Sequence, residues 1–228
     1  MGLYIRKPNA VIGIFCIGLN TYWAQFEGLK EAVLDHYGKI KELLPEDIRV
    51  IDGGLVDDYT AADKANRAFE EAGADLIFCY CATYSPSSNV LPVIRGLSAP
   101  VVVLNLQPES SVDCRQTDTI GAWLGTLSCA GAPEVTAVLK KKNASYGVVT
   151  GAIAEDPQVV SELHAWCKAA CVAARLKRGR IGMIGHPFNG MMDLYVCLLY
   201  TSGIPGEGAE KTGGAECAAK PDQPAFSL

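Results

Sequence analysis

The sequence lacks the signatures of several large protein classes. No apolar run approaches the roughly 20 residues that cross a bilayer, and the first residues lack the charged-then-apolar order of a secretory signal. Gly-rich phosphate loops, a Gly-x-Ser-x-Gly turn and a His-Glu-x-x-His pair are all absent. The formal net charge of −5 disfavours a nucleic-acid surface. We therefore expect a cytoplasmic protein without membrane or nucleic-acid partners.

Cysteine is abundant, but no two cysteines have the two-residue spacing of a zinc knuckle or a redox motif. Cys16, Cys79 and Cys81 lie in apolar, strand-like runs, and Cys167 and Cys171 share one face of a predicted helix. This favours buried free thiols in a reducing compartment over disulfides or a metal site. Cys79 and Cys81 fall on one face of a strand, which disfavours a racemase with two opposed thiols.

The stretch at 75–86, Asp-Leu-Ile-Phe-Cys-Tyr-Cys-Ala-Thr-Tyr-Ser-Pro, organises the chain. Its apolar centre is short and ends before Pro86, which is typical of a strand buried on both faces. Thr83, Tyr84 and Ser85 follow the carboxyl end of that strand, where open parallel sheets bind ligands. These hydroxyls suit a polyol-like ligand, or they belong to a polar loop that caps the next helix.

Strand-like and helix-like segments alternate along the chain. Strands are predicted at 11–17, 48–51, 76–81, 101–104, 146–150 and 180–184. Helices are predicted at 23–44, 60–72, 87–97, 118–127, 133–141 and 156–176. The alternation predicts an α/β fold with a doubly wound, mostly parallel sheet of the Rossmann or flavodoxin-like type.

The domain organisation follows from the same pattern. We expect an N-terminal doubly wound domain over 1–176 and the start of a truncated second α/β domain over 177–196. Residues 197–228 lose all apolar periodicity and are rich in Gly, Pro and Ala, which predicts a disordered tail.

Polar and aromatic side chains gather after three predicted strands, at 20–23, 83–85 and 105–107. The carboxyl ends of parallel strands meet at one edge of the sheet, so their coincidence favours a ligand site there. His36 and His164 fall on predicted helices and are expected at the surface, and His186 lies in a glycine-rich turn.

An ordered set of motifs over 9–196 resembles the L-fucose/L-arabinose isomerase family. The motifs are Gly-Leu-Asn-Thr-Tyr-Trp at 18–23, Gly-Leu-Val-Asp at 54–57, Asp-Leu-Ile-Phe at 75–78, Thr-Tyr-Ser at 83–85, Asn-Leu-Gln-Pro at 105–108, Pro-Glu at 133–134, Gly-Met-Ile-Gly-His at 182–186 and Gly-Met-Met-Asp at 190–193. The resemblance implies the N-terminal portion of a Mn²⁺-dependent aldose–ketose isomerase that forms a trimer or hexamer. It also implies that the metal ligands and acid/base residues lie outside this sequence, so the chain alone is expected to be inactive.

The resemblance further implies contacts to a monosaccharide. The matching positions are Asn20, Tyr84, Gln107 and Met191, with Tyr22 and Trp23 as adjacent candidates. No catalytic or metal-binding residue is assigned. The alternative function is a non-catalytic sugar-binding or sensing module, and the alternative role of Tyr84 and Trp23 is packing at a subunit interface.

Overall fold

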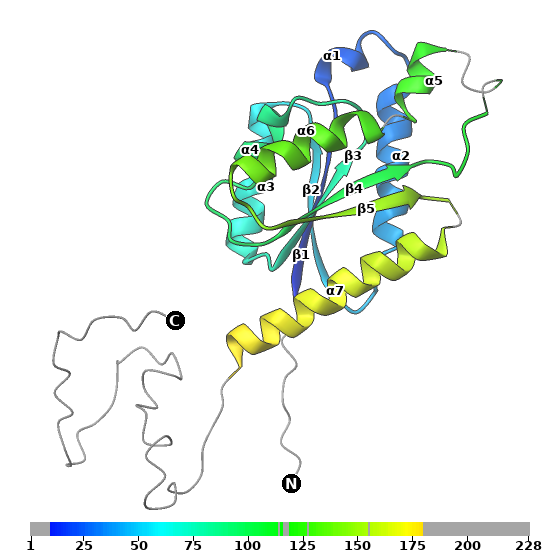
Figure 1. The fold of residues 1–228 in the computed structure, drawn as a ribbon. Helices are drawn as coiled ribbons and strands as arrows, with labels where there is room; N and C mark the ends of the chain where they lie inside the picture. The colour runs from blue at the N-terminus through cyan, green and yellow to red at the C-terminus, as the bar shows by residue number, and fades with distance from the viewer. Residues whose placement is uncertain (1–9, 114, 116–118, 127, 155, 180–228) are drawn as a thin grey trace, which may run out of the picture. The chain divides into compact units, whose positions relative to one another are not determined.

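The fold is a five-stranded parallel sheet with helices on both faces (Figure 1). The computed structural model describes residues 10–113, 115, 119–126, 128–154 and 156–179. The strands are β1 (Val11–Ile17), β2 (Arg49–Val56), β3 (Leu76–Cys81), β4 (Val101–Gln107) and β5 (Tyr146–Ala152). All neighbours pair in parallel in the order β2-β1-β3-β4-β5, which confirms the predicted doubly wound α/β fold.

Helices connect successive strands. They are α1 (Asn20–Trp23), α2 (Leu29–Glu42), α3 (Tyr59–Ala72), the 3₁₀ turn η1 (Ser87–Asn89), α4 (Val90–Val93), α5 (Ile120–Leu124), α6 (Ser128–Lys141) and α7 (Pro157–Arg178). Within the described residues, no helix is both long enough and apolar enough to cross a membrane.

Two apolar layers, one on each face of the sheet, form the core. On one face α2 and α7 contribute buried residues such as Val33 and Leu163. On the other face α3, α4 and α6 contribute residues such as Phe69 and Val135. β1 and β3 are buried along their whole length, because both of their faces are covered, as the apolar run at 76–81 indicated.

Two predicted boundaries were wrong because of glycine. The helix predicted at 23–44 is divided into α1 and α2, and Gly28 between them has a φ of 79°, which the right-handed helix does not allow. The strand predicted at 48–51 extends to Val56. The extension was not predicted because Gly53 and Gly54 are atypical of strand interiors. The register between β1 and β2 shifts beside them.

The helices on the β3–β4 and β4–β5 connections also differ from the prediction. The helix predicted at 87–97 consists only of η1 and α4 and ends at Val93, and Gly96 has a φ of 77°, which the right-handed helix does not allow. The one predicted at 118–127 is α5. The helix predicted to begin at Pro133 is α6, which begins at Ser128 and contains Pro133.

Most of the domain prediction beyond the first sheet lies outside the described residues. Residues 177 and 178 belong to α7, whereas the predicted sixth strand at 180–184 and the predicted tail at 197–228 are not described. These remain predictions.

Candidate functional site

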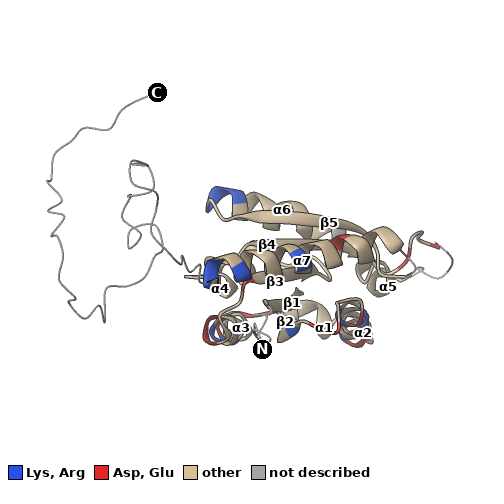
Figure 2. Cartoon of the chain, turned by 90° about the horizontal axis from the view of Figure 1, so that it is seen from below, with Lys and Arg blue, Asp and Glu red and all other residues tan. Residues whose placement is uncertain are grey.

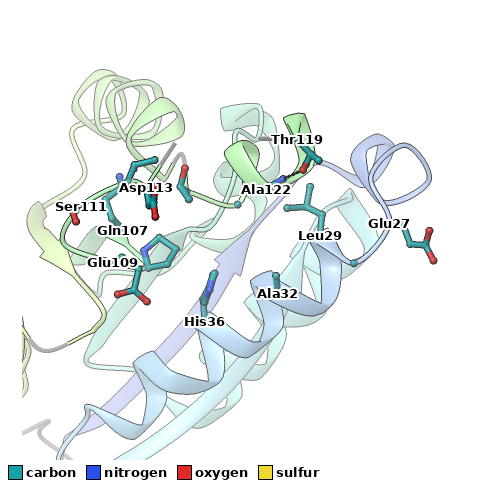
Figure 3. Close-up of a pocket in the computed structure, with 16 residues that line it drawn as sticks. Glu27, Leu29, Ala32, His36, Gln107, Glu109, Ser111, Asp113, Thr119 and Ala122 are labelled. Carbon is teal, nitrogen blue, oxygen red and sulfur yellow. Dashed lines mark hydrogen bonds between the residues drawn. The ribbon is translucent and has the colours of Figure 1, made fainter. Parts of the chain in front are cut away.

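The carboxyl end of β4 opens into a pocket of about 650 Å³ (Figure 3). One wall comes from the amino-terminal half of α2 and the glycine turn before it. The opposite wall comes from the end of β4, the segment that follows it, and α5. Ligands of open parallel sheets occupy crevices at this edge, so the location agrees with the sequence prediction of a site there.

Acidic and hydroxyl groups dominate the polar lining of the pocket. The acidic residues are Glu27, Glu109 and Asp113, and the hydroxyl residues are Ser111, Thr119 and Thr126. No Lys or Arg lies among the described residues that form the wall. A phosphate or carboxylate ligand would therefore meet like charges, whereas hydroxyl or ammonium groups would meet hydrogen-bond acceptors.

His36 contributes the one imidazole of the wall. Its ring projects from α2 toward the segment that carries Glu109 (Figure 3). Burial lowers the pKa of His36, and the nearby charge of Lys39 lowers it further against the opposing effect of Asp35 and Glu109. The ring is therefore neutral at pH 7, and its buried Nδ1 has no hydrogen-bond partner.

Of the residues predicted to contact a ligand, Gln107 lines this pocket. It is the last residue of β4, which runs three residues further than the sequence indicated. His36 on α2 and Thr119, the N-cap of α5, were not predicted as parts of the site. A polar residue on a helix surface has the same sequence signal whether it faces water or a pocket.

The other predicted residues do not line this pocket. The Trp23 indole donates a hydrogen bond to Asp57 Oδ2 at 2.7 Å, and its ring packs so closely on Gly18 that a Cβ there would lie 2.7 Å from it. Tyr22 makes an edge-to-face contact with Phe26, with ring centroids 5.8 Å apart.

Three further predicted residues lie apart from the pocket or outside the described chain. Asn20 is exposed at the start of α1. Tyr84 is 38% exposed, and the charge of Glu134 raises the pKa of its phenol. Met191 lies outside the described residues. Whether any of them contacts a ligand stays a prediction.

The described residues contain no group of three or more His, Cys, Asp or Glu side chains arranged to hold a metal ion. The manganese implied by the resemblance was assigned to ligands outside this sequence, so that assignment also stays a prediction.

Comparison with known proteins identifies no family for this chain. No family model matches the chain, and no curated protein matches it. Among solved structures, the chain is similar to a GDSL-like lipase from Bacteroides thetaiotaomicron, with 10% sequence identity and a TM-score of 0.38. The alignment covers 72% of this chain and 88% of that one. At this level of similarity the match carries no argument about function.

The predicted membership of the L-fucose/L-arabinose isomerase family was wrong. Neither the family models nor the curated proteins support it. The prediction of aldose–ketose isomerase activity was therefore also wrong, and the alternative of a sugar-binding module is not supported either. The motifs behind the resemblance are short, and those in the described residues lie in strands, just after strands or in α6, so they are compatible with the α/β fold without specifying a family.

Proposed function

We propose that this domain binds a small polar molecule without net negative charge in the pocket between α2 and the β4–α5 connection. The observation that carries the proposal is the lining: three carboxylates and three hydroxyl groups, with no Lys or Arg among the described residues of the wall. A volume of about 650 Å³ is within the range of small-molecule sites.

The neutral imidazole of His36 also supports the proposal. Its imidazole offers one donor and one acceptor without adding positive charge to the pocket. A ligand with hydroxyl or ammonium groups could pair with His36 and the carboxylates together. We assign no reaction to the site.

The test is a titration of the isotope-labelled chain, followed by nuclear magnetic resonance, with three probes of one carbon skeleton. Glycerol carries only hydroxyl groups, 2-amino-1,3-propanediol adds an ammonium group, and glycerate adds a carboxylate. We expect the amide signals of His36, Glu109 and Thr119 to shift with the first two probes and not with glycerate. Equal or stronger shifts with glycerate, or no shift with any probe, would contradict the proposal.

A pocket-filling variant locates the binding. Ala32 is exposed on α2 and lines the pocket, so Ala32→Leu fills the space while keeping a good helix former. The matched control is Ala137→Leu, an exposed alanine of α6 that does not line the pocket. We expect Ala32→Leu to abolish the shifts and Ala137→Leu to leave them unchanged.

We also propose that the protein works in a reducing compartment such as the cytoplasm. Cys16, Cys79, Cys81, Cys167 and Cys171 are free thiols, and most are buried. Free thiols persist where glutathione keeps them reduced. Recovery of the tagged protein in the cytosolic fraction would support this, and recovery in a secretory compartment would contradict it.

A further inference from the structure

We propose that β5 pairs with β5 of a second copy of this chain, antiparallel and about a two-fold axis, so that two sheets join into one. In the described part of the chain, β5 is an edge strand that pairs only with β4. An open edge presents a row of backbone donors and acceptors to any strand that can reach it. β5 lies at the end of the row of strands in Figure 2.

Apart from the Asp156 carboxylate, which accepts a hydrogen bond from Ala152 N at 3.1 Å, β5 carries none of the features that protect an edge strand. Its sequence, Tyr-Gly-Val-Val-Thr-Gly-Ala, contains no charge and no proline. Tyr146 and Val148 are 39% and 43% exposed. The opposite edge of the sheet differs: β2 contains Arg49 and Asp52, and its register with β1 is irregular, both of which hinder pairing.

The hydrogen bonds to β4 fix which residues of β5 face outward. Ser145 O accepts from Val101 N at 2.9 Å, and Ile153 N donates to Gln107 O at 2.7 Å. Both of these flanking residues point toward β4, and the direction alternates along a strand. The backbone groups that face away from β4 are therefore those of Tyr146, Val148, Thr150 and Ala152, and of these Ala152 N already donates to Asp156 Oδ2 at 3.1 Å.

The length of β5 favours one register. With the two-fold axis at Val149, Val148 lies opposite Thr150 of the second copy, and Tyr146 lies opposite Ala152. The Val148–Thr150 pairs can each exchange two backbone hydrogen bonds, whereas Ala152 N already donates to Asp156 Oδ2. Moving the axis by one residue still sets outward residues opposite each other, but it places one end of β5 opposite residues beyond the strand, so only the central axis pairs all four outward residues.

The charges beyond β5 favour the same antiparallel arrangement. Lys140, Lys141 and Lys142 are exposed just before the strand, and Asp156 follows it. In the antiparallel arrangement, the end of β5 that follows the lysines in one copy lies toward the Asp156 end of β5 in the other. A parallel arrangement of two copies would instead place the lysines of both copies together. Figure 2 shows Lys and Arg, in blue, at one end of α6.

The experiment measures the mass of the full chain in solution by analytical ultracentrifugation at micromolar to millimolar concentrations. We expect a dimer. Val148→Lys places a charge on the edge and should weaken self-association at least about tenfold. The matched control is Leu34→Lys on α2, because Leu34 is 42% exposed and lies outside β5. This variant should dimerise like the unmodified chain, and circular dichroism should show both variants folded.

A charge swap tests the register. Thr150→Glu alone should also be monomeric, while an equimolar mixture of Val148→Lys and Thr150→Glu should form a heterodimer, since the introduced lysine and glutamate then face each other. A monomeric unmodified chain, a Val148→Lys variant that still dimerises, or a mixture that stays monomeric would each overturn the proposal. If Val148→Lys lowers the stability of a monomeric chain, another segment of the same chain covers the edge, and the proposal is wrong.

Discussion

Three hydrogen bonds converge on the carboxylate of Asp52 in β2. Lys41 Nζ and the Tyr37 hydroxyl each lie 2.6 Å from one of its oxygens, and Gly54 N donates at 2.8 Å. The Tyr37 hydroxyl also lies 3.0 Å from the Ile14 carbonyl oxygen, so this group ties α2 to both β1 and β2. Burial acts to raise the pKa of Asp52, but the three hydrogen bonds together outweigh it and hold the pKa below its usual range.

Asp52→Asn should therefore destabilise the protein in a pH-dependent way. The native pKa is lower than the unfolded one, so the stabilisation is complete above the unfolded value of about 3.9 and is lost as pH falls through the native value. Because the side chain is 47% exposed, we expect a loss of only about 0.5–1 kcal/mol at pH 7. Urea unfolding at neutral pH and below about pH 4 measures it.

The difference between Asp52→Asn and the unmodified chain should shrink toward zero in acid. The control is Glu71→Gln, an exposed residue near the end of α3, which should stay within about 0.5 kcal/mol at every pH. A loss for Asp52→Asn that is equal at neutral and acidic pH would show that the charge of Asp52 is not what stabilises this contact.

At the scale of elements, two glycines let α3 approach the sheet. A Cβ on Gly13 of β1 would lie 2.9 Å from the ring of Phe69, and a Cβ on Gly53 of β2 would lie 2.7 Å from it. Phe69 is fully buried, and buried side chains are closely packed by their neighbours. The spacing between α3 and these strands is therefore set by the missing side chains.

Gly13→Ala should destabilise the protein by about 1–3 kcal/mol, because the added methyl group overpacks the contact with Phe69. Gly38 on α2 is the matched control, since a Cβ there meets nothing within 4 Å and its position is inside a helix. Gly38→Ala should stabilise by about 0.5–1 kcal/mol. Chemical unfolding of both variants tests the pair, and equal effects in the same direction would contradict the packing argument.

At the scale of the whole molecule, the two apolar layers shield the central strands from solvent. Cys16, Cys79 and Cys81 are fully buried in β1 and β3. Cys167 is buried where α7 meets the sheet, and burial raises the pKa of its thiol to about 12. The predicted buried free thiols are thus confirmed for these four residues. A reagent can reach the strand thiols only when the layers separate.

Alkylation with iodoacetamide at mildly alkaline pH should therefore be ordered along the chain. Cys171 is only partly buried and should react before Cys167 and the strand cysteines, while Cys16, Cys79 and Cys81 should react only at the rate of global unfolding. Peptide mass spectrometry of timed samples gives the rate at each site. Labelling of Cys79 as fast as Cys171 in the native protein would mean that the sheet opens locally.

The sequence by itself determined the architecture. The runs at 11–17, 76–81 and 101–104 are apolar on both faces, and only a central strand of a parallel sheet needs that composition. The capping of α7 by Asp156 and the end of α3 at Gly73 were also predictable, because both depend on local hydrogen bonds and backbone angles. Families that share this architecture share these features, which is why the resemblance to the isomerases misled.

Only the tertiary structure decided the pocket and the free edge. His36 and Glu109 are far apart in sequence and come together because α2 and β4 pack on the same sheet. Gln107 was predictable because it ends a strand, whereas the wall residues of α2 and α5 depend on which helix face turns toward the pocket. The exposure of Val148 likewise depends on β5 being last in the sheet, and strand order is a property of long-range packing that no local pattern encodes.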